Sequence, residues 1–366
     1  MSRTSKKIRN VFPLLVAENN SYLSYYQSGC GKWDRNDFSF FNQNVPLRLA
    51  ELRESLIDGT YNLGPYTFFV VYEPKERIIM KLPVRDRIAQ HMWDNVINPM
   101  MDNKFYYHSY ACRVNKGIHA ASQQLKNWMY WKICVEGKNL YALKGDIYNY
   151  FWNVHHDILF NQFCRFVKDD QLLELTWKFI SQNGQLLPNG VGIPVGNLTS
   201  QLFANVYGNI LDEFVTQQLK CHMYIRYMDD MVIIADSLEY LKNLFKILSY
   251  KLSSIKLKIK NNYQFFTIAE SPKAKGRAID FMGFKFYMKK TVLRKSIMLK
   301  CSRKARRIAK EHKPKIHSIR QMLSYYGWIK HTDVKEFTKS RIDNIIDFRQ
   351  YRNRMSIYDR RRIHAA

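Results

Sequence analysis

The sequence predicts an α+β fold, and three of its features support this expectation. Two short runs rich in β-branched and aromatic residues, at 224–228 and 231–235, have the composition of β-strands. Between 202 and 214, apolar residues recur at helical spacing. The chain has 366 residues, of which 46% are hydrophobic and 14% aromatic, which is enough for a sizeable core. We therefore expect one folded protein built of two or three subdomains.

The two strand-like runs enclose a pair of adjacent aspartates, Asp229 and Asp230, within the string Tyr-Met-Asp-Asp-Met. We expect a β-hairpin that turns at these aspartates. Two like charges held this close repel each other unless a cation neutralises them, so the pair indicates a divalent metal site. The alternative is an ordinary Asp-Asp turn with no further role.

A further carboxylate is expected at the end of another strand, because a two-metal site needs ligands on both sides of the ion pair. Residues 139–146 alternate apolar and polar side chains and end at Asp146, as a strand would. Residues 153–160 then have the pattern of a helix start, with Asn153 as the expected N-cap.

Tyr-Met-Asp-Asp at a hairpin tip resembles the catalytic motif of reverse transcriptases, and residues 146–151 (Asp-Ile-Tyr-Asn-Tyr-Phe) resemble the motif that supplies the first metal-binding aspartate. The resemblance implies two Mg²⁺ ions held by Asp146, Asp229, Asp230 and the carbonyl of Ile147. It also implies that Phe151 excludes a 2′-hydroxyl, with core packing as the plain alternative. The implied fold is a right-hand polymerase with fingers, a palm whose antiparallel sheet is backed by helices, and a short helical thumb.

A glycine- and proline-rich segment, residues 188–201, precedes the expected helix. Glycine lets a ligand approach the backbone, and a helix N-terminus exposes N–H groups, although a plain turn before a core helix is the alternative. The segment resembles the motif of reverse transcriptases in which Val195 and Gly196 would contact the nucleotide, and Ser200 and Gln201 the template. Most such enzymes have glutamine before this glycine and end in Ser-Pro. The form seen here resembles the reverse transcriptases of diversity-generating retroelements.

A second hairpin is expected upstream, from strand-like runs at 67–72 and 77–82 that flank Glu-Pro-Lys-Glu. The resemblance to reverse transcriptases implies that this hairpin belongs to the fingers. It implies that Arg77 contacts the incoming nucleotide, and it supports the same role for Lys75 less strongly. Arg113 resembles another arginine of the same fingers. For each of these residues the alternative is a solvated or ion-paired side chain.

Two later segments add to the expected site. Residues 253–260 alternate apolar residues with lysine, as a half-exposed strand does, and the resemblance makes Lys258 a general acid for the leaving pyrophosphate. Residues 281–287 resemble the primer-grip hairpin, in which Gly283 lets the backbone meet the primer terminus. The alternatives are a solvated basic edge strand and a plain amphipathic strand.

The chain is strongly basic, with a formal net charge of +27. Residues 289–366 alone hold 23 Lys or Arg against 6 Asp or Glu, which indicates a polyanionic partner. Within 302–310, cationic residues fall on most faces of the expected helix. This pattern favours a helix that binds along a phosphate backbone over an amphipathic helix that binds a membrane. We expect Arg303, Lys304, Arg306 and Arg307 to contact template and primer.

The six cysteines show no CxxC spacing, so neither a zinc site nor a disulfide framework is expected. His155 and His156, adjacent on a helix, point in different directions and are not expected to bind a metal. No apolar run is long enough to span a membrane, and the N-terminus lacks a signal-peptide core, so we expect a cytoplasmic protein, bacterial or phage-encoded.

The resemblance implies an RNA-directed DNA polymerase that copies a template-repeat RNA into cDNA, with errors at template adenines, for mutagenic retrohoming. Its partners would be template RNA, the RNA–DNA hybrid, dNTPs and a small oligomeric accessory protein. The expected subdomains are 1–135 (N-terminal segment and fingers), 136–287 (palm) and 288–366 (thumb and tail). The alternatives are another bacterial reverse transcriptase (retron, group II intron or antiphage type), a viral RNA-dependent RNA polymerase, and a non-catalytic RNA-binding scaffold.

Overall fold

The computed structural model describes residues 7–364 except 34, 73–75, 137–138 and 183–187. The chain forms two compact units, and it passes from one to the other several times. The first unit comprises residues 1–113, 146–222 and 244–262, and the second comprises 114–145, 223–243 and 263–366. Neither unit is therefore a single stretch of sequence.

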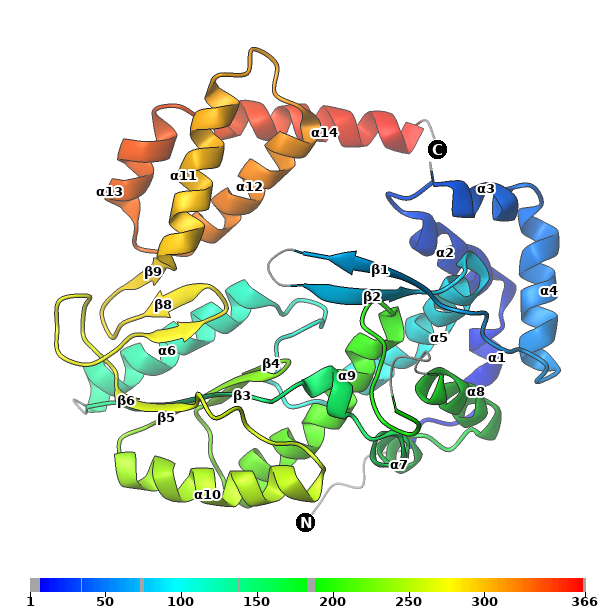
Figure 1. Ribbon diagram of the computed structural model, residues 1–366, viewed down its shortest axis with the longest axis horizontal. Helices are drawn as coiled ribbons and strands as arrows, with labels where there is room; N and C mark the ends of the chain where they lie inside the picture. Colours follow the sequence, from blue (N-terminus) through cyan, green and yellow to red (C-terminus); the bar gives the residue numbers. More distant parts are fainter. Residues whose placement is uncertain (1–6, 34, 73–75, 137–138, 183–187, 365–366) are drawn as a thin grey trace. The chain divides into compact units, whose positions relative to one another are not determined.

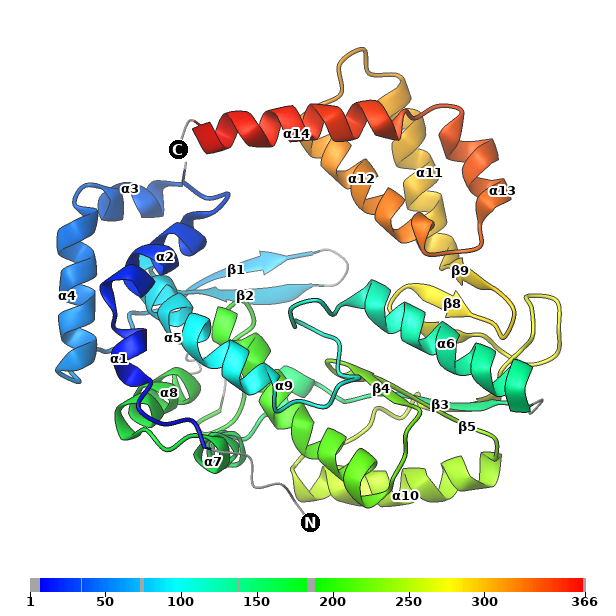
Figure 2. The same cartoon turned by 180° about the vertical axis from the view of Figure 1, so that it is seen from behind.

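The first unit is mainly helical (Figures 1 and 2). Its elements are α1 (Phe12–Leu15), α2 (Glu18–Gly29), α3 (Asn36–Asn42), α4 (Val45–Ile57), β1 (Thr67–Val71), β2 (Arg77–Lys81), α5 (Val84–Asp102), the 3₁₀ helix η1 (Tyr150–Asn153), α7 (His156–Phe166), α8 (Asp170–Ser181), α9 (Leu198–Glu213) and the π-helical η2 (Phe214–Gln218). Helix α10 (Leu238–Ser254) contributes residues to both units.

The core of the first unit is centred on Trp93 of α5, which is fully buried. Its ring lies edge-on to Phe163 of α7, Phe179 of α8 and Phe203 of α9, with centroid distances of 5.8, 6.2 and 5.6 Å. The indole N–H donates to the Thr176 hydroxyl at 2.9 Å, so the one polar atom of the ring is satisfied. Four helices are held together at this residue.

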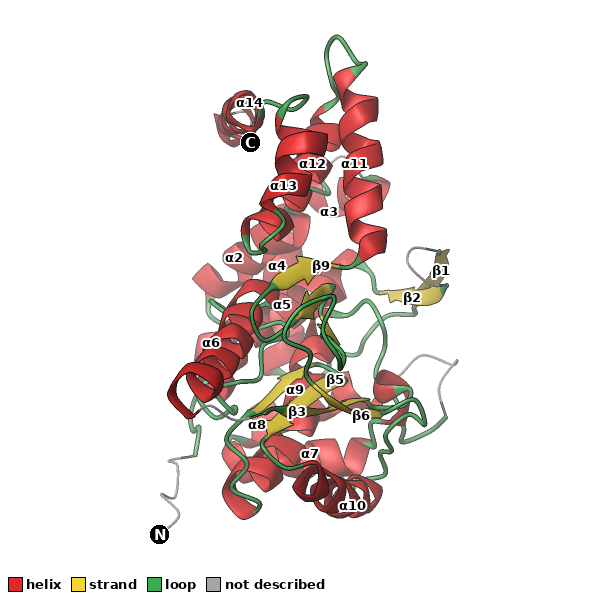
Figure 3. Ribbon diagram, turned by 90° about the vertical axis from the view of Figure 1, so that its left-hand side faces the viewer, coloured by secondary structure: helices red, strands yellow, loops and turns green. Residues whose placement is uncertain are grey.

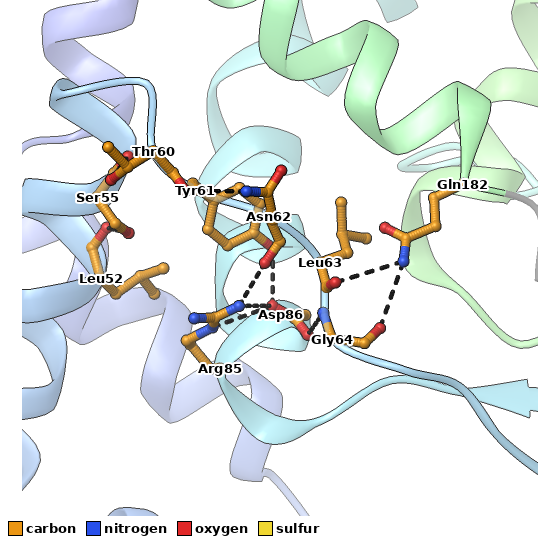
Figure 4. Close-up of polar contacts among 10 residues, drawn as sticks. All are labelled: Leu52, Ser55, Thr60, Tyr61, Asn62, Leu63, Gly64, Arg85, Asp86 and Gln182. Atoms are coloured by element: carbon orange, nitrogen blue, oxygen red, sulfur yellow. Dashed lines mark hydrogen bonds and ion pairs between the residues drawn. The ribbon is translucent and has the colours of Figure 1, made fainter.

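The predicted upstream hairpin is confirmed: β1 and β2 pair antiparallel, from Thr67 opposite Lys81 to Val71 opposite Arg77. The segment before β1 is anchored by Asp86, a fully buried carboxylate near the start of α5 (Figure 4). Asp86 accepts hydrogen bonds from the Tyr61 hydroxyl at 2.9 Å and from the Gly64 N–H at 2.8 Å. Burial raises the pKa of Tyr61 well above its usual value, so Tyr61 remains a donor.

The second unit contains two antiparallel arrangements of strands (Figure 3). One sheet has the order β4-β5-β3-β6, and the other has the order β7-β8-β9. The strands are β3 (Tyr141–Asp146), β4 (Tyr224–Tyr227), β5 (Asp230–Ala235), β6 (Gln264–Thr267), β7 (Ile279–Phe281), β8 (Phe284–Phe286) and β9 (Thr291–Leu293). The strands predicted at 139–146, 224–228 and 231–235 are confirmed within a residue or two.

The helices of the second unit are α6 (Ile118–Glu136), α11 (Lys295–Ala309), α12 (Ile316–Lys330), α13 (Lys335–Thr338), the π-helical η3 (Lys339–Asp343) and α14 (Phe348–His364). Trp328 of α12 stacks on Phe284 of β8 at 5.2 Å, which attaches this helix to the three-stranded sheet. None of the helices in the described part of the chain is both long and apolar enough to cross a bilayer. The described cysteines at positions 30, 112, 164, 221 and 301 are not paired with one another in disulfides.

Candidate active site

The paired aspartates lie at a hairpin, as predicted, but the turn is one residue earlier than expected. Tyr227 pairs with Asp230, so Met228 and Asp229 form the two-residue tip and Asp230 is the first residue of β5. Met228 has φ +58°, a backbone conformation that costs a non-glycine residue energy and is common at functional sites. The buried Arg226 guanidinium donates to the Met228 carbonyl at 3.1 Å and so supports this turn.

A lysine that the sequence reasoning did not single out lies against Asp230. The Lys144 ammonium is 3.5 Å from the Asp230 carboxylate, and both side chains are about one-fifth exposed. Lys144 belongs to β3, and side chains two residues apart on a strand share a face, so Asp146 lies on the same face of β3 as Lys144. No sequence pattern indicates this ion pair, because the two residues are 86 positions apart.

Asp146 is the last residue of β3, as predicted, and the chain beyond it is held by residues 258–260. The Lys260 N–H donates to the Asp146 carbonyl, and the Tyr148 N–H to the Lys258 carbonyl, both at 2.8 Å. Ile147 forms an isolated antiparallel bridge with Ile259 between these bonds. In such a pair the N–H and the C=O of Ile147 both point away from residues 258–260.

The strand predicted for residues 253–260 is wrong. Helix α10 continues through Ser254, and a turn with Lys256 at φ +58° follows, so only Ile259 forms a β-bridge. The helix prevails because Leu241, Leu244, Leu248 and Leu252 are all buried, and their spacing extends the helical period to the end of α10. Lys258 is exposed, and its ammonium lies 4.5 Å from the centre of the Tyr148 ring.

Phe151 is half-buried in η1, and its backbone is tied to the glycine-rich segment. The Ile193 N–H donates to the Phe151 carbonyl at 2.9 Å, and the Gly192 N–H to the Val154 carbonyl at 2.7 Å. The predicted cap at Asn153 is wrong: α7 begins at His156, and the Asn153 amide bonds back to the Tyr148 carbonyl at 2.9 Å. The His156 ring bonds to the Gly192 carbonyl, and burial lowers its pKa, so His156 has a structural role.

The glycine-rich segment also contacts the upstream hairpin. The Met80 N–H of β2 donates to the Val195 carbonyl at 2.9 Å. Gly196 has φ +118°, and a Cβ there would lie 2.8 Å from the Ile79 side chain and 2.9 Å from the Met80 carbonyl oxygen. Glycine at 196 is therefore required both by the backbone conformation and by the approach of β2. Helix α9 begins at Leu198, four residues earlier than the apolar spacing suggested.

A pocket of about 390 Å³ opens beside this contact, and the sequence did not indicate it. Its lining includes five basic or imidazole side chains, from Lys32, Arg35, Lys81, Arg87 and His91. Asp37 pairs with Lys81 at 2.7 Å and with Arg87, so one carboxylate faces several cations. Burial lowers the pKa of His91 to about 4, and His91 is therefore neutral at pH 7.

Two buried donors of this pocket have no hydrogen-bond partner among the described residues: the Gln90 Nε2 and the Arg87 Nε. Gln90 is 2% exposed, and its carbonyl oxygen accepts from the Leu198 N–H, at the start of α9, at 3.2 Å. Buried donors without partners are costly, and together with the excess positive charge they fit an anionic ligand. The basic residues at 32 and 35 follow α2 in a short loop, a signal too weak to assign from sequence.

The other residues predicted to contact template or nucleotide differ in how exposed they are. Gln201 lines the pocket, whereas Ser200 is buried at 1% exposure. Arg77 is exposed at the start of β2, and Lys75 lies outside the described residues. Arg113 is held inside the protein by the Asp102 carboxylate and by the carbonyls of residues 102, 106 and 109. These contacts give Arg113 a structural role in the loop after α5.

Gly283 lies in the tight β7–β8 turn, with φ +84°. A Cβ at this position would meet the Trp328 ring, so α12 alone already requires glycine there. In α11, Arg303, Arg306 and Arg307 are exposed, whereas Lys304 is half-buried and donates to the Ser318 hydroxyl at 3.1 Å. The expectation of cations on most faces is corrected, because one face of α11 is buried, at residues 301, 302, 305 and 308.

The oxygen atoms of Asp146, Asp229, Asp230 and the Ile147 carbonyl are the candidate metal ligands. All three carboxylates are half-buried. Asp146 belongs to the first unit, and the paired aspartates belong to the second. Within the described ranges, no three His, Cys, Asp or Glu side chains are grouped as a metal site. The ligand set is therefore a prediction from the strand ends and from the chemistry of the donors.

The chain is similar in sequence to known proteins. A family model described as "Reverse transcriptase (RNA-dependent DNA polymerase)" matches residues 73–286. The chain is 28% identical over 182 residues to Protein YkfC of Escherichia coli K12, covering 48% of this chain and 47% of that protein. It is 25% identical over 209 residues to the Group II intron-encoded protein LtrA of Lactococcus lactis subsp. cremoris, covering 55% and 33%.

The chain thus spans about half, or less, of the length of these curated relatives. Among solved structures, telomerase from Candida albicans in complex with a fragment of telomeric RNA is similar with a TM-score of 0.49 at 10% identity. That similarity covers 76% of this chain and 55% of the telomerase chain.

Proposed function

The chain belongs to the reverse transcriptase (RNA-dependent DNA polymerase) family, and from this premise we propose that it extends a primer by copying RNA into DNA. The family match, with the helices and antiparallel sheets of the two units, confirms the predicted right-hand polymerase fold class. The observation that carries the proposal is a pair of strand ends: Asp146 closes β3, and Asp230 opens β5, its neighbour in the sheet. The subdomain boundaries after residues 135 and 287 stay predictions.

The donor set fits magnesium. Carboxylate and carbonyl oxygens are the hard ligands that Mg²⁺ prefers, and we infer that Asp146, Asp229 and Asp230 hold the ions with help from the Ile147 carbonyl. When bound, two such ions stabilise the attacking primer oxygen and the leaving triphosphate oxygens. Lys144 and a metal ion are both positively charged, so Lys144 must either share the Asp230 carboxylate with the ion or move away from that carboxylate.

The residues around the aspartates would position the nucleotide. The Phe151 backbone is held by Ile193. We propose that the Phe151 ring excludes a 2′-hydroxyl. The Val195 and Gly196 backbone lies against β2, so the hairpin that carries Arg77 is held against the glycine-rich segment. Arg77 would then reach the triphosphate, and Lys258 would supply a proton to the leaving pyrophosphate.

Two basic surfaces support binding of nucleic acid. The pocket beside Gly196 offers buried donors and uncompensated positive charge, which fits a phosphate of the template strand, with Gln201 at its edge. Helix α11 exposes Arg303, Arg306 and Arg307 on the side opposite its buried face, which fits contacts along a phosphate backbone. We propose that these surfaces bind the template RNA and the RNA–DNA hybrid.

The proposed activity is tested by the substitution Asp229→Asn. We expect primer extension on an RNA template with Mg²⁺ to be lost, because a metal ligand is removed, while RNA binding stays within about twofold because no basic residue changes. Asp157→Asn, at an exposed position of α7, is the matched control and should extend primers normally. Extension by Asp229→Asn at the wild-type rate would show that the metal assignment is wrong.

We further propose that this enzyme is of the diversity-generating retroelement type, and that it copies a template-repeat RNA inaccurately at adenines with an oligomeric accessory protein. The support is sequence 195–204, with Val195 before Gly196 and Ser200-Gln201 at its end. The alternative is a group II intron type of enzyme, which is favoured by the similarity to the intron-encoded protein of Lactococcus.

This subtype is tested by fidelity. An aliphatic side chain at 195 can restrain a nucleotide only by shape, and one apolar contact changes selectivity by about 10- to 200-fold at most. We therefore expect wild type to misincorporate opposite template adenine more often than opposite the other bases. We also expect Val195→Gln to reduce that error. Equal accuracy opposite all four bases would exclude the mutagenic subtype and leave the reverse transcriptase assignment standing.

A further inference from the structure

We propose that Tyr148 is a positioning residue: its ring holds the ammonium of Lys258 in place for proton transfer to the leaving pyrophosphate. This inference rests on the proposed function, because it concerns the chemistry of the same site. It assigns a role to a residue that sequence reasoning passed over, although Tyr148 is only two positions from Asp146.

The first support is the backbone contact between the two segments. The Tyr148 N–H donates to the Lys258 carbonyl at 2.8 Å, and the Lys260 N–H donates to the Asp146 carbonyl at 2.8 Å. Together with the bridge between Ile147 and Ile259, these bonds fix the register of 146–148 against 258–260. Lys258 therefore has a defined backbone position relative to the metal-binding segment, although it lies in a turn region after α10.

The register decides which side chains share a face. Residues directly opposite each other in an antiparallel pair project to the same side. Ile147 and Ile259 thus share one face, and Ile147 is buried at 1% exposure. Asp146, Tyr148, Lys258 and Lys260 project from the other face. The proposed metal ligand, the tyrosine ring and the proposed proton donor are therefore on one side of this ladder.

The second support is the side-chain contact. The Lys258 ammonium lies 4.5 Å from the centre of the Tyr148 ring, within the range of a cation–π interaction. Lysine has a flexible four-carbon stem, and an exposed lysine samples many rotamers. Tyr148 is 42% exposed and Lys258 is also exposed, so water reaches both residues. The ring thus favours, among the many positions of the ammonium, those close to the Tyr148 ring.

The primer 3′-oxygen forms a bond to the α-phosphorus, and the bond from that phosphorus to the pyrophosphate oxygen breaks. The proton of the 3′-hydroxyl passes to solvent, and the Lys258 ammonium gives one proton to the departing pyrophosphate oxygen. Lys258 then regains a proton from water. Tyr148 takes no proton and makes no bond to the nucleotide in this scheme.

The experiment measures single-turnover incorporation of one nucleotide on an RNA template with a DNA primer and Mg²⁺. Four variants are compared: Tyr148→Leu, Tyr148→Phe, Lys258→Met and the double variant Tyr148→Leu/Lys258→Met. Tyr250→Leu, at an 81% exposed position of α10, is the matched control for loss of a surface tyrosine. Each rate is resolved into the maximal incorporation rate and the apparent nucleotide affinity, and thermal unfolding is recorded for every variant.

We expect Lys258→Met to lower the maximal rate by at least about tenfold. Tyr148→Leu should lower it by about 2- to 5-fold without changing nucleotide affinity. Tyr148→Phe keeps the aromatic face and should restore the rate to within about twofold of wild type. In the Lys258→Met background, Tyr148→Leu should have no further effect, because the group it positions is absent.

The proposal is overturned if Tyr148→Leu slows incorporation as much in the Lys258→Met background as in wild type, or if Tyr148→Phe fails to restore the rate. It is also overturned if Lys258→Met leaves the rate unchanged while wild type extends primers, and in that case the proposed function stands. Wild-type protein that extends no primer would reject the proposed function itself.

Discussion

Replacing Gly196 by alanine tests the contact between the glycine-rich segment and the upstream hairpin. Gly196 has φ +118°, and an added Cβ would lie 2.8 Å from the Ile79 side chain and 2.9 Å from the Met80 carbonyl oxygen. The isoleucine methyl can give way, but the carbonyl belongs to β2 and cannot move without the strand. Gly190→Ala is the control, since Gly190 has φ +74° in the same segment with no atom within 4 Å of its Cβ position.

The expected difference follows from these environments. Both substitutions impose a left-handed conformation on alanine, which costs about 1–2 kcal/mol. Only Gly196→Ala also overpacks the contact with β2, at about 1–3 kcal/mol, and strains the hydrogen bond from Met80 to Val195, worth about 1 kcal/mol. We expect Gly196→Ala to reduce the free energy of unfolding by about 2–4 kcal/mol more than Gly190→Ala does.

The assay is urea denaturation of both variants together with primer extension at varied dNTP concentration. Because Gly196→Ala pushes the segment away from the hairpin that carries Arg77, we expect a higher KM for dNTP in that variant alone. Equal loss of stability in the two variants would refute the close approach of β2. An unchanged KM with the expected loss of stability would refute the coupling of this contact to nucleotide binding.

Two further predictions concern charge. Replacing the exposed Arg303, Arg306 and Arg307 by alanine should make the plot of log RNA affinity against log salt concentration less steep, by the equivalent of up to about three phosphate contacts. Replacing the half-buried Lys304 should change this slope less. An unchanged slope would mean that α11 does not contact RNA. Burial raises the pKa of Asp94 from 3.8 to about 6, so the folded state penalises its ionised form, and this group lowers stability as pH rises from about 4 to about 6. The free energy of unfolding of Asp94→Asn should therefore exceed that of wild type by about 1–3 kcal/mol at pH 7 and equal it at pH 3. Urea denaturation at both pH values measures this difference. A lower free energy of unfolding for Asp94→Asn at pH 7 would show that the carboxylate is stabilising.

Local pattern was enough to predict most of the elements that carry the candidate site. The hairpin around Asp229, the strand that ends at Asp146 and the upstream hairpin each follow from β-branched or alternating residues bounded by turn residues. The same kind of pattern misled at 253–260, where alternation of lysine and apolar residues suggested a strand. There the buried leucines of α10 extend the helix through Ser254, and packing outweighs a short alternating run.

The sequence alone indicated Asp146, Asp229 and Asp230 and the strands that carry them. The packing of distant segments decides which side chains meet: Lys144 with Asp230, Tyr148 with Lys258, β2 with Gly196, and the basic residues of the α2–α3 loop, β2 and α5 around one pocket. It also decided that Arg113 is held inside the protein by Asp102. The physical reason is that periodicity reports the surroundings of a residue along its own element, whereas contacts between elements depend on how distant segments pack against one another.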